Sequence, residues 1–245
     1  MKNDGIWILQ MNPLSKLNRN WTRGMLDSLP MGISFIVFGS VFGVMAIQTG
    51  LTPIESMLMS LVSFAGSAQL SILPMMAENA SISAMVLAAL LINVRHLLYG
   101  LSLSPYFTKF DLKFTNFIAY FLSDALYALS LQHCKRPQPQ KSYLTSAGIF
   151  LYFSWGLGTF IGTITSSFLP AQKDLGLDFS ITAIFLIMAY TEVTSFLKIV
   201  TFLMTGLIMI ILSSVFPMGI LLLIAGVIAF VVGYVSPDRL FERSG

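Results

Sequence analysis

The sequence contains very little charge. Only 10% of its 245 residues are Asp, Glu, Lys or Arg, whereas 56% are hydrophobic. A soluble domain typically carries about 25% charged residues, so this chain lacks the polar groups that would cover a water-exposed surface of its size. Its mean hydropathy is +0.80. The composition therefore predicts an integral membrane protein.

Residues that serve catalysis and metal binding are also scarce. Cys134 is the only cysteine, which excludes an intrachain disulfide and a cysteine metal cluster. With His96 and His133 as the only histidines, we expect no metal site. The GxxxxGK[ST] phosphate loop and the HExxH and GxSxG patterns are absent. We therefore expect no enzymatic activity and no cofactor. We also expect no nucleic-acid partner, because the pI near 9.0 is explained by basic loops.

Long apolar runs occupy most of the chain. Each is long enough, at roughly 17–25 residues, to cross a hydrocarbon core of about 30 Å. They lie near residues 30–49, 54–76, 81–106, 114–133, 143–168, 180–197, 198–214 and 216–235. The pattern predicts an all-α, polytopic membrane helix bundle with seven to eight hydrophobic segments in the plasma membrane, embedded in a lipid bilayer.

The domain organisation follows from these runs. We expect a polar cytoplasmic segment over 1–29, one transmembrane transport domain over 30–235 and a short tail over 236–245, with no cleaved leader. Basic residues favour the cytoplasmic side. This rule places the N-terminal segment and the loop 135–141 inside, but simple counting of crossings then places the basic loop 109–113 outside. A run that enters and leaves on one side would remove the disagreement, and 54–76 is the best candidate.

Two Gly-rich aromatic stretches, 32–43 and 148–162, echo one another, and each is followed by a Gly-Leu pair. Transporters are often built from internal repeats, although membrane helices reuse Gly, Leu and Phe in any case. The first stretch contains Gly39 and Gly43, and the second contains Gly158 and Gly162. Both pairs form GxxxG, a spacing typical of close helix packing.

A few ionisable residues interrupt the apolar runs, and Arg95 lies about 14 residues into a run of roughly 26. A charge at a helix centre costs about 2.5–3.5 kcal/mol on insertion scales. Two basic groups, Arg95 and Lys198, face two acidic groups, Asp124 and Glu192, so pairing across the bundle is expected. The sequence leaves open whether Arg95 pairs with Asp124, and whether Glu192 pairs with Lys198 or Arg95. Asp124 and Glu192 are the candidates for coupling to an ion.

The residues around Arg95 suit a zwitterionic ligand. At helical spacing Asn93 and His96 share one face, and Arg95 and Tyr99 share another. Arginine presents a fork of donors to a carboxylate, and Asn and neutral His both donate and accept hydrogen bonds. We therefore name Asn93, Arg95, His96 and Tyr99 as substrate-binding candidates. The alternative is that Arg95 only locks two helices together.

Small residues crowd the stretch SFAGSAQL at 63–70, where a membrane helix is normally rich in leucine. Such residues allow close helix packing, or they allow a broken or re-entrant helix that exposes backbone groups to a cavity. Gly66, Ser67 and Gln69 are substrate-binding candidates in the second case. Asp124 has Tyr120 and Tyr127 at i−4 and i+3, so one helical face is expected to carry all three side chains.

Several of these stretches together resemble the AzlC-type branched-chain amino acid permease (azaleucine resistance) family. FAGSAQ (64–69) and INVRHLLYGLSLSPYF (92–107) carry the resemblance, and FLSDALYAL, WGLGTFIG and GLDFSITAIFL follow in order, over about residues 24–235. The resemblance implies export of leucine, isoleucine and valine, driven by an ion gradient. It also implies a hetero-oligomer with a small AzlD-type membrane protein. The family pattern Thr-Asp-Glu is replaced by Ser123-Asp124-Ala125, so the neighbouring glutamate is lost.

Two other functions remain as alternatives. An ion or proton channel would more often repeat one polar residue type along a pore, whereas the charges here are mixed and scattered. A scaffold subunit without transport activity would not need Arg95, His96 and Asp124 deep in apolar segments. The residues therefore favour a transporter.

Overall fold

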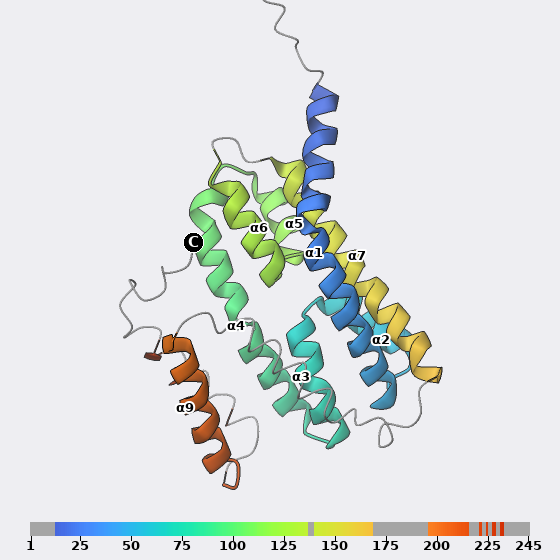
Figure 1. Cartoon of the computed structure of the whole chain (residues 1–245), viewed down its shortest axis with the longest axis vertical. Helices are drawn as coiled ribbons and strands as arrows, with labels where there is room; N and C mark the ends of the chain where they lie inside the picture. The colour runs from blue at the N-terminus through green and yellow to red at the C-terminus, as the bar shows by residue number, and fades with distance from the viewer. Residues whose placement is uncertain are drawn as a thin grey trace, which may run out of the picture. The chain divides into compact units, whose positions relative to one another are not determined.

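The computed structural model describes residues 13–136, 140–168 and 196–215, together with six single positions between 221 and 232, and the described side chains begin at Arg19. These residues form helices and connecting turns (Figure 1). The helices are α1 (Pro13–Gln48), α2 (Pro53–Ser63), α3 (Gly66–Ala77), α4 (Ile82–Phe107), α5 (Leu112–Tyr120), α6 (Asp124–Cys134), α7 (Lys141–Thr165) and α9 (Phe196–Leu212). Glu192 lies outside the described residues.

The apolar runs give two kinds of helix. Within the described residues, three helices are long and apolar enough to cross a membrane, over Arg19–Gln48, Ile82–Phe107 and Lys141–Phe168, and α9 is a shorter apolar helix. Two further runs are each interrupted near their middle, as α2 and α3 and as α5 and α6. The break expected in 63–70 is confirmed, but the prediction of one continuous segment over 114–133 is wrong. The run 180–197 lies almost entirely outside the described residues, as does most of 216–235.

The chain divides into two compact units whose segments alternate along the sequence. The first contains residues 1–47, 51–66 and 94–166, and the second contains 48–50, 67–93 and 167–245. The first unit therefore holds α1, α2, α5, α6, α7 and the C-terminal half of α4. Helix α1 begins at Pro13 and continues through Pro30, so the second half of the polar segment expected over 1–29 is helical.

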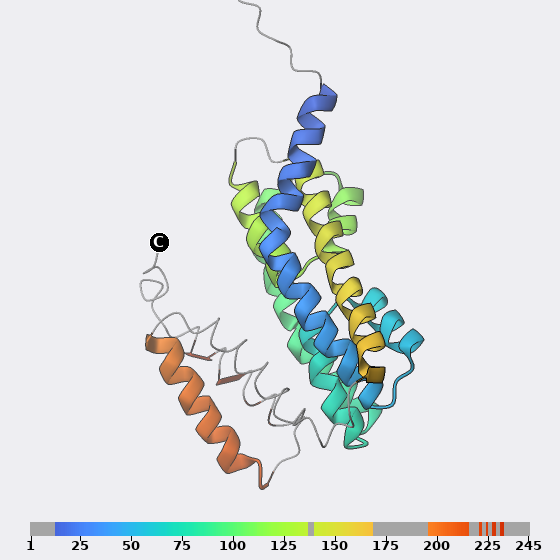
Figure 2. The ribbon, with the colours of Figure 1, turned by 45° about the vertical axis from the view of Figure 1, so that its right-hand side comes forward.

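Glycines hold α1 against α7 in the first unit, and the two helices lie side by side in both views (Figures 1 and 2). A methyl group added at Gly39 would lie 2.7 Å from the Trp155 carbonyl oxygen, and one added at Gly162 would lie 2.9 Å from Cα of Gly43. The two GxxxG pairs thus pack on each other, as expected of such faces. Gly24 contacts Tyr143, so contacts advance in the same direction along both helices, which are parallel.

This parallel pair is what a repeat of 32–43 in 148–162 requires if the two stretches have the same orientation. The segment that would follow α7 in such a repeat falls in 169–195, outside the described residues. The internal repeat therefore stays a prediction.

One end of the first unit gathers the basic loops, and we call it the Lys141 end. Lys141 forms an ion pair with Asp111, and the Tyr143 hydroxyl donates to Asp27 at 2.9 Å. The pKa of Asp111 is lowered, mainly because its carboxylate accepts a hydrogen bond from Lys141. Residues 109–113, and residues 135, 136, 140 and 141 of the other basic loop, thus lie at the same end as the N-terminal part of α1. The conflict with the positive-inside rule disappears, and a cytoplasmic Lys141 end is the orientation that this rule predicts.

Helices α5 and α6 explain why both loops share this end. The side chain of Asp111 caps α5 by accepting the Phe114 N–H, and α5 runs inward to Tyr120. The Ser123 side chain then accepts the Leu126 N–H and starts α6, which returns to place the His133 ring 3.9 Å from that of Tyr143. The pair is a re-entrant hairpin. Tyr120 therefore belongs to the other half-helix, and the expectation that it shares a helical face with Asp124 is wrong.

Helix α2 approaches the middle of α7 from the opposite end. Thr52 and Glu55 form a capping box at its start, a combination that satisfies the first free backbone N–H groups. Farther along, the Ser60 and Thr159 hydroxyls lie 2.7 Å apart, and the Phe64 ring lies 5.2 Å from that of Tyr152. Helix α2 thus runs antiparallel to α7 and stops near its centre. Phe64 ends it with φ 41°, a left-handed conformation that is costly for a residue other than glycine.

The glycine contact between α1 and α7 gives a direct test. Gly162→Ala is expected to lower the free energy of unfolding by about 1–3 kcal/mol, because the added methyl group overlaps the α1 backbone. Gly100→Ala is the matched control: no atom lies within 4 Å of its added methyl group, so it should be neutral or stabilise by up to about 1 kcal/mol. Thermal unfolding of the detergent-solubilised chain measures both. Equal melting temperatures for the two variants would contradict the packing.

Candidate functional site

A charged cluster joins the C-terminal half of α4 to the first turn of α6. Arg95 Nη1 lies 2.9 Å from Asp124 Oδ2, and the Tyr99 hydroxyl donates to Asp124 Oδ1 at 2.5 Å. One turn farther, the Ser102 and Tyr127 hydroxyls lie 2.9 Å apart. The rings of Tyr99 and Tyr127 stack with centroids 4.4 Å apart. Both carboxylate oxygens of Asp124 are therefore engaged by α4.

The helix periodicity explains this ladder. Arg95, Tyr99 and Ser102 stand at i, i+4 and i+7 on one face of α4, and Asp124 and Tyr127 stand at i and i+3 of α6. The re-entrant break places Asp124 at the first position of α6, where the helix dipole favours a negative charge. Of the two pairings that the sequence left open for Arg95, the structure contains the one with Asp124.

The cluster is accessible. Arg95 is the fourteenth of the 26 residues of α4, yet its side chain remains 31% exposed and that of Asp124 47% exposed. A charge at this depth is stable only against protein, water or a polar solute, because hydrocarbon would not solvate it. The pair is therefore a place where a charged solute can meet the chain.

The first unit brings four of the predicted site residues together. Besides Arg95, Tyr99 and Asp124, it contains His96, whose ring lies 5.7 Å from that of Tyr99. Ser67, Gln69 and Asn93 belong to the second unit, in which Gln69 is buried. The binding or coupling role of every predicted site residue, including Gly66 and Glu192, stays a prediction.

The broken end of α2 depends on two tyrosines that sequence reasoning did not assign to it. The Leu61 carbonyl accepts hydrogen bonds from the Tyr120 hydroxyl and from the Tyr152 hydroxyl at 2.9 Å. The last four carbonyls of a helix have no partner within it, and a membrane interior offers no water to replace one. Small residues in 63–70 signalled the break, but nothing local signalled partners that lie 59 and 91 residues away in sequence.

Tyr152 is also where the two breaks meet. Its ring lies 5.2 Å from that of Phe64, which ends α2, and 5.4 Å from that of Phe121, which follows α5. Gly66, the first residue of α3, lies against the indole of Trp155, one turn along α7 from Tyr152. Backbone groups released by both breaks thus surround one stretch of α7.

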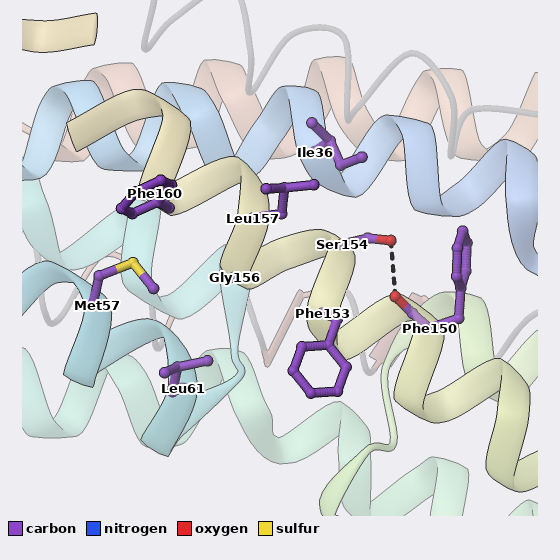
Figure 3. A pocket seen from close by; sticks show the side chains of 9 residues that line it. All are labelled: Ile36, Met57, Leu61, Phe150, Phe153, Ser154, Gly156, Leu157 and Phe160. Carbon is purple, nitrogen blue, oxygen red and sulfur yellow. Dashed lines mark hydrogen bonds between the residues drawn. The ribbon is translucent and has the colours of Figure 1, made fainter. Parts of the chain in front are cut away.

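An apolar cavity of about 520 Å³ lies in the first unit between α1, α2 and α7 (Figure 3). Its lining residues are Ile36, Met57, Leu61, Phe150, Phe153, Ser154, Gly156, Leu157 and Phe160. The Ser154 hydroxyl donates to the Phe150 carbonyl at 2.8 Å, so this polar side chain is already satisfied. The cavity suits hydrocarbon, either a lipid tail or an aliphatic side chain, and none of the charged cluster lines it.

The described residues contain no group of three or more His, Cys, Asp or Glu side chains placed to hold a metal ion. The polar groups of the charged cluster are one ion pair and aromatic hydroxyls.

The chain belongs to the AzlC family. The family model described as AzlC protein matches residues 30–169, a range that includes every predicted site residue except Glu192. The resemblance of the sequence motifs to this family is thus confirmed. This membership, together with the long apolar helices, identifies the chain as a membrane protein.

Three relatives illustrate the similarity. The inner membrane protein YgaZ of Escherichia coli K12 is 33% identical over 170 residues, which cover 66% of this chain and 69% of the relative. A membrane protein of Archaeoglobus fulgidus is 28% identical and covers 73% of this chain and 78% of its own length. A membrane protein of Helicobacter pylori 26695 is 28% identical, with 66% and 72% covered. No solved structure matches the chain significantly.

The ion pair can be tested by a double-mutant cycle. Arg95→Ala leaves the Asp124 carboxylate without its cation and is expected to destabilise the chain by about 1–3 kcal/mol, less than a fully buried pair because both side chains are partly exposed. The double variant Arg95→Ala/Asp124→Ala should recover part of this loss. Unfolding of each purified variant gives the coupling energy, and a coupling near zero would contradict the pair.

The two tyrosines on Leu61 should behave cooperatively. Tyr120→Phe and Tyr152→Phe are each expected to cost about 0.5–1.5 kcal/mol. The double variant should cost more than the sum, since the carbonyl then loses its last partner. Tyr106→Phe serves as the control, because the Tyr106 hydroxyl makes no hydrogen bond in the described part of the chain. Strict additivity in thermal unfolding would show that the hydroxyls do not share this carbonyl.

Proposed function

We propose that the chain is the transport subunit of a secondary transporter that exports branched-chain amino acids, namely leucine, isoleucine and valine, across the plasma membrane. Membership of the AzlC family supports this proposal. The observation that carries it is the accessible Arg95–Asp124 pair halfway along an apolar helix. Paired opposite charges match a zwitterion better than they match a single ion.

Asp124 is the proposed exchange point. Its carboxylate binds the ammonium group of the amino acid or a proton, but not both, and this competition is what an exporter driven by an inward proton gradient requires. Arg95 can remain on Oδ2 while the ammonium replaces Tyr99 on Oδ1. Because the family glutamate is absent at Ala125, Asp124 carries this role alone or shares it with Glu192.

The carboxylate of the solute has two candidate partners in this proposal. One is Arg95, whose guanidinium has further N–H donors beyond the one on Asp124. The other is the first turn of α3, at Gly66 and Ser67, because the N-terminus of a helix favours an anion. His96, Gln69 and Asn93 supply additional polar contacts, and apolar side chains receive the aliphatic part.

A small AzlD-type membrane protein is the proposed partner in a hetero-oligomer. Only 6% of the most apolar window of α4 is buried within the described chain, although this helix carries Arg95. Lipid alone would solvate that guanidinium poorly. A partner helix that covers part of this surface would exclude lipid from the charged cluster.

Efflux from proteoliposomes that contain the chain and its partner tests this function. Vesicles loaded with labelled leucine should lose it faster when the outer pH is below the inner pH, because this gradient drives protons inward in exchange for leucine. Asp124→Asn is expected to slow efflux at least about tenfold and to flatten its pH dependence, since an amide neither titrates nor pairs with an ammonium.

Asp111→Asn is the matched control, because it makes the same chemical change in a loop and asparagine also caps a helix. Its efflux should keep the wild-type pH profile. An unaltered pH profile in Asp124→Asn would remove Asp124 from the coupling step. Leucine efflux that is the same with and without the protein would remove the exporter function.

A further inference from the structure

A small cavity of about 130 Å³ lies in the first unit between α4 and α5. Its wall includes Leu103, Phe107 and Ile118, and all three side chains are buried. Gly100 also lines the cavity but is exposed, so the cavity is open on that side. An apolar cavity of about 150 Å³ accommodates a benzene molecule. This one therefore has room for a small branched hydrocarbon group.

Two hydroxyl groups belong to residues that line the cavity, but neither requires a polar occupant. The Thr115 hydroxyl donates to the Asp111 carbonyl at 3.2 Å, and Ser104 is exposed. Burying a hydroxyl without a partner is costly, but the first hydroxyl is already paired and the second lies at the open side. The cavity therefore suits an apolar occupant.

The cavity adjoins the charged cluster through both helices that form it. On α4, Tyr99 donates to Asp124 and stands four residues before Leu103, so Tyr99 and Leu103 are neighbours on the helix surface. On the other side, Leu122 lines the cavity two residues before Asp124, and two residues of backbone span at most about 7 Å. A solute held at the carboxylate of Asp124 is thus next to the cavity.

Close packing does not explain why residue 100 is a glycine. The other glycines in the described helices of the first unit each have an atom within 3.2 Å of where a methyl group would stand. None of the described residues has an atom within 4 Å of a methyl group added at Gly100, although glycine is less favourable than alanine inside a helix. Because Gly100 lines the cavity, a side chain there would narrow it. The glycine therefore keeps the cavity open.

We infer that this cavity receives the aliphatic side chain of the transported amino acid while its ammonium group binds Asp124, and that Gly100 sets the size limit. The ammonium and the terminal methyl groups of leucine are only a few bonds apart, so a leucine on Asp124 reaches a cavity that begins at Leu122. A lipid tail is the rival occupant, but a cavity of this volume holds only a few of its carbons. This inference rests on the proposed function and adds the element that distinguishes one aliphatic amino acid from another.

Efflux from the same proteoliposomes tests the size limit with labelled leucine and valine. Gly100→Ala adds one methyl group to the cavity and should lower kcat/KM for leucine at least about tenfold, as a misfit of one methylene does in an apolar pocket. Valine is one methylene shorter and should change less than about threefold, so the leucine-to-valine ratio falls. Gly206→Ala is the matched control, because an added methyl group in α9 also has no atom of the described residues within 4 Å. It should leave the ratio unchanged.

The opposite change gives a gain of function, which a folding defect cannot produce. Leu103→Ala enlarges the cavity and should raise the efflux of labelled phenylalanine at least about tenfold above that of the wild-type chain. Leu101→Ala makes the same change at an exposed position of α4 that does not line the cavity, and should give no such gain.

The results that contradict the inference differ from those that contradict the transporter. An unchanged leucine-to-valine ratio in Gly100→Ala would overturn the side-chain subsite, whether both rates fall or neither does, because lipid or a partner helix would then fill the cavity. Absence of phenylalanine efflux from a folded Leu103→Ala variant would also overturn it. Both results leave the transporter in place. A wild-type chain that gives no leucine efflux would remove the proposed function and this inference together.

Discussion

Backbone groups released inside an apolar environment are the constraint on which the first unit depends. A helix that stops in a membrane leaves carbonyl groups without water to bind. Here the Leu61 carbonyl is satisfied by hydroxyls from Tyr120 at the end of α5 and Tyr152 on α7. A side chain at the break after α5 thus stabilises the end of α2.

Packing between the helices connects these breaks to the other contacts of the first unit. Tyr152 is held in place because α7 lies against α1 through facing glycines, and α1 in turn places Phe35 and Phe42 on Trp155. The break after Tyr120 starts α6 at Asp124, which brings a carboxylate to Arg95. The same re-entrant path returns the chain to the Lys141 end. One structural device therefore accounts for the buried polar contacts, the charged pair and the distribution of basic loops.

The sequence predicted those features whose signal is local. Low charge and long runs gave the membrane helix bundle, small residues in 63–70 gave the first break, and the need to neutralise Arg95 included Asp124 among its partners. The second break was missed because Tyr120, Phe121 and Leu122 are apolar, and only Ser123-Asp124 resembles a helix start. Tyr152 carried no signal at all, since aromatic residues are ordinary in membrane helices and its hydroxyl gains meaning only from Leu61, 91 residues away in sequence. The binding or coupling roles of all the predicted site residues remain predictions.

The central claim is that the Arg95–Asp124 pair, which the break before α6 brings together, binds a zwitterionic solute. Electron cryo-microscopy of the chain with its proposed partner in lipid, with and without leucine, tests it most directly. The account predicts leucine density beside this pair, with the ammonium toward Asp124. Leucine density elsewhere would contradict it.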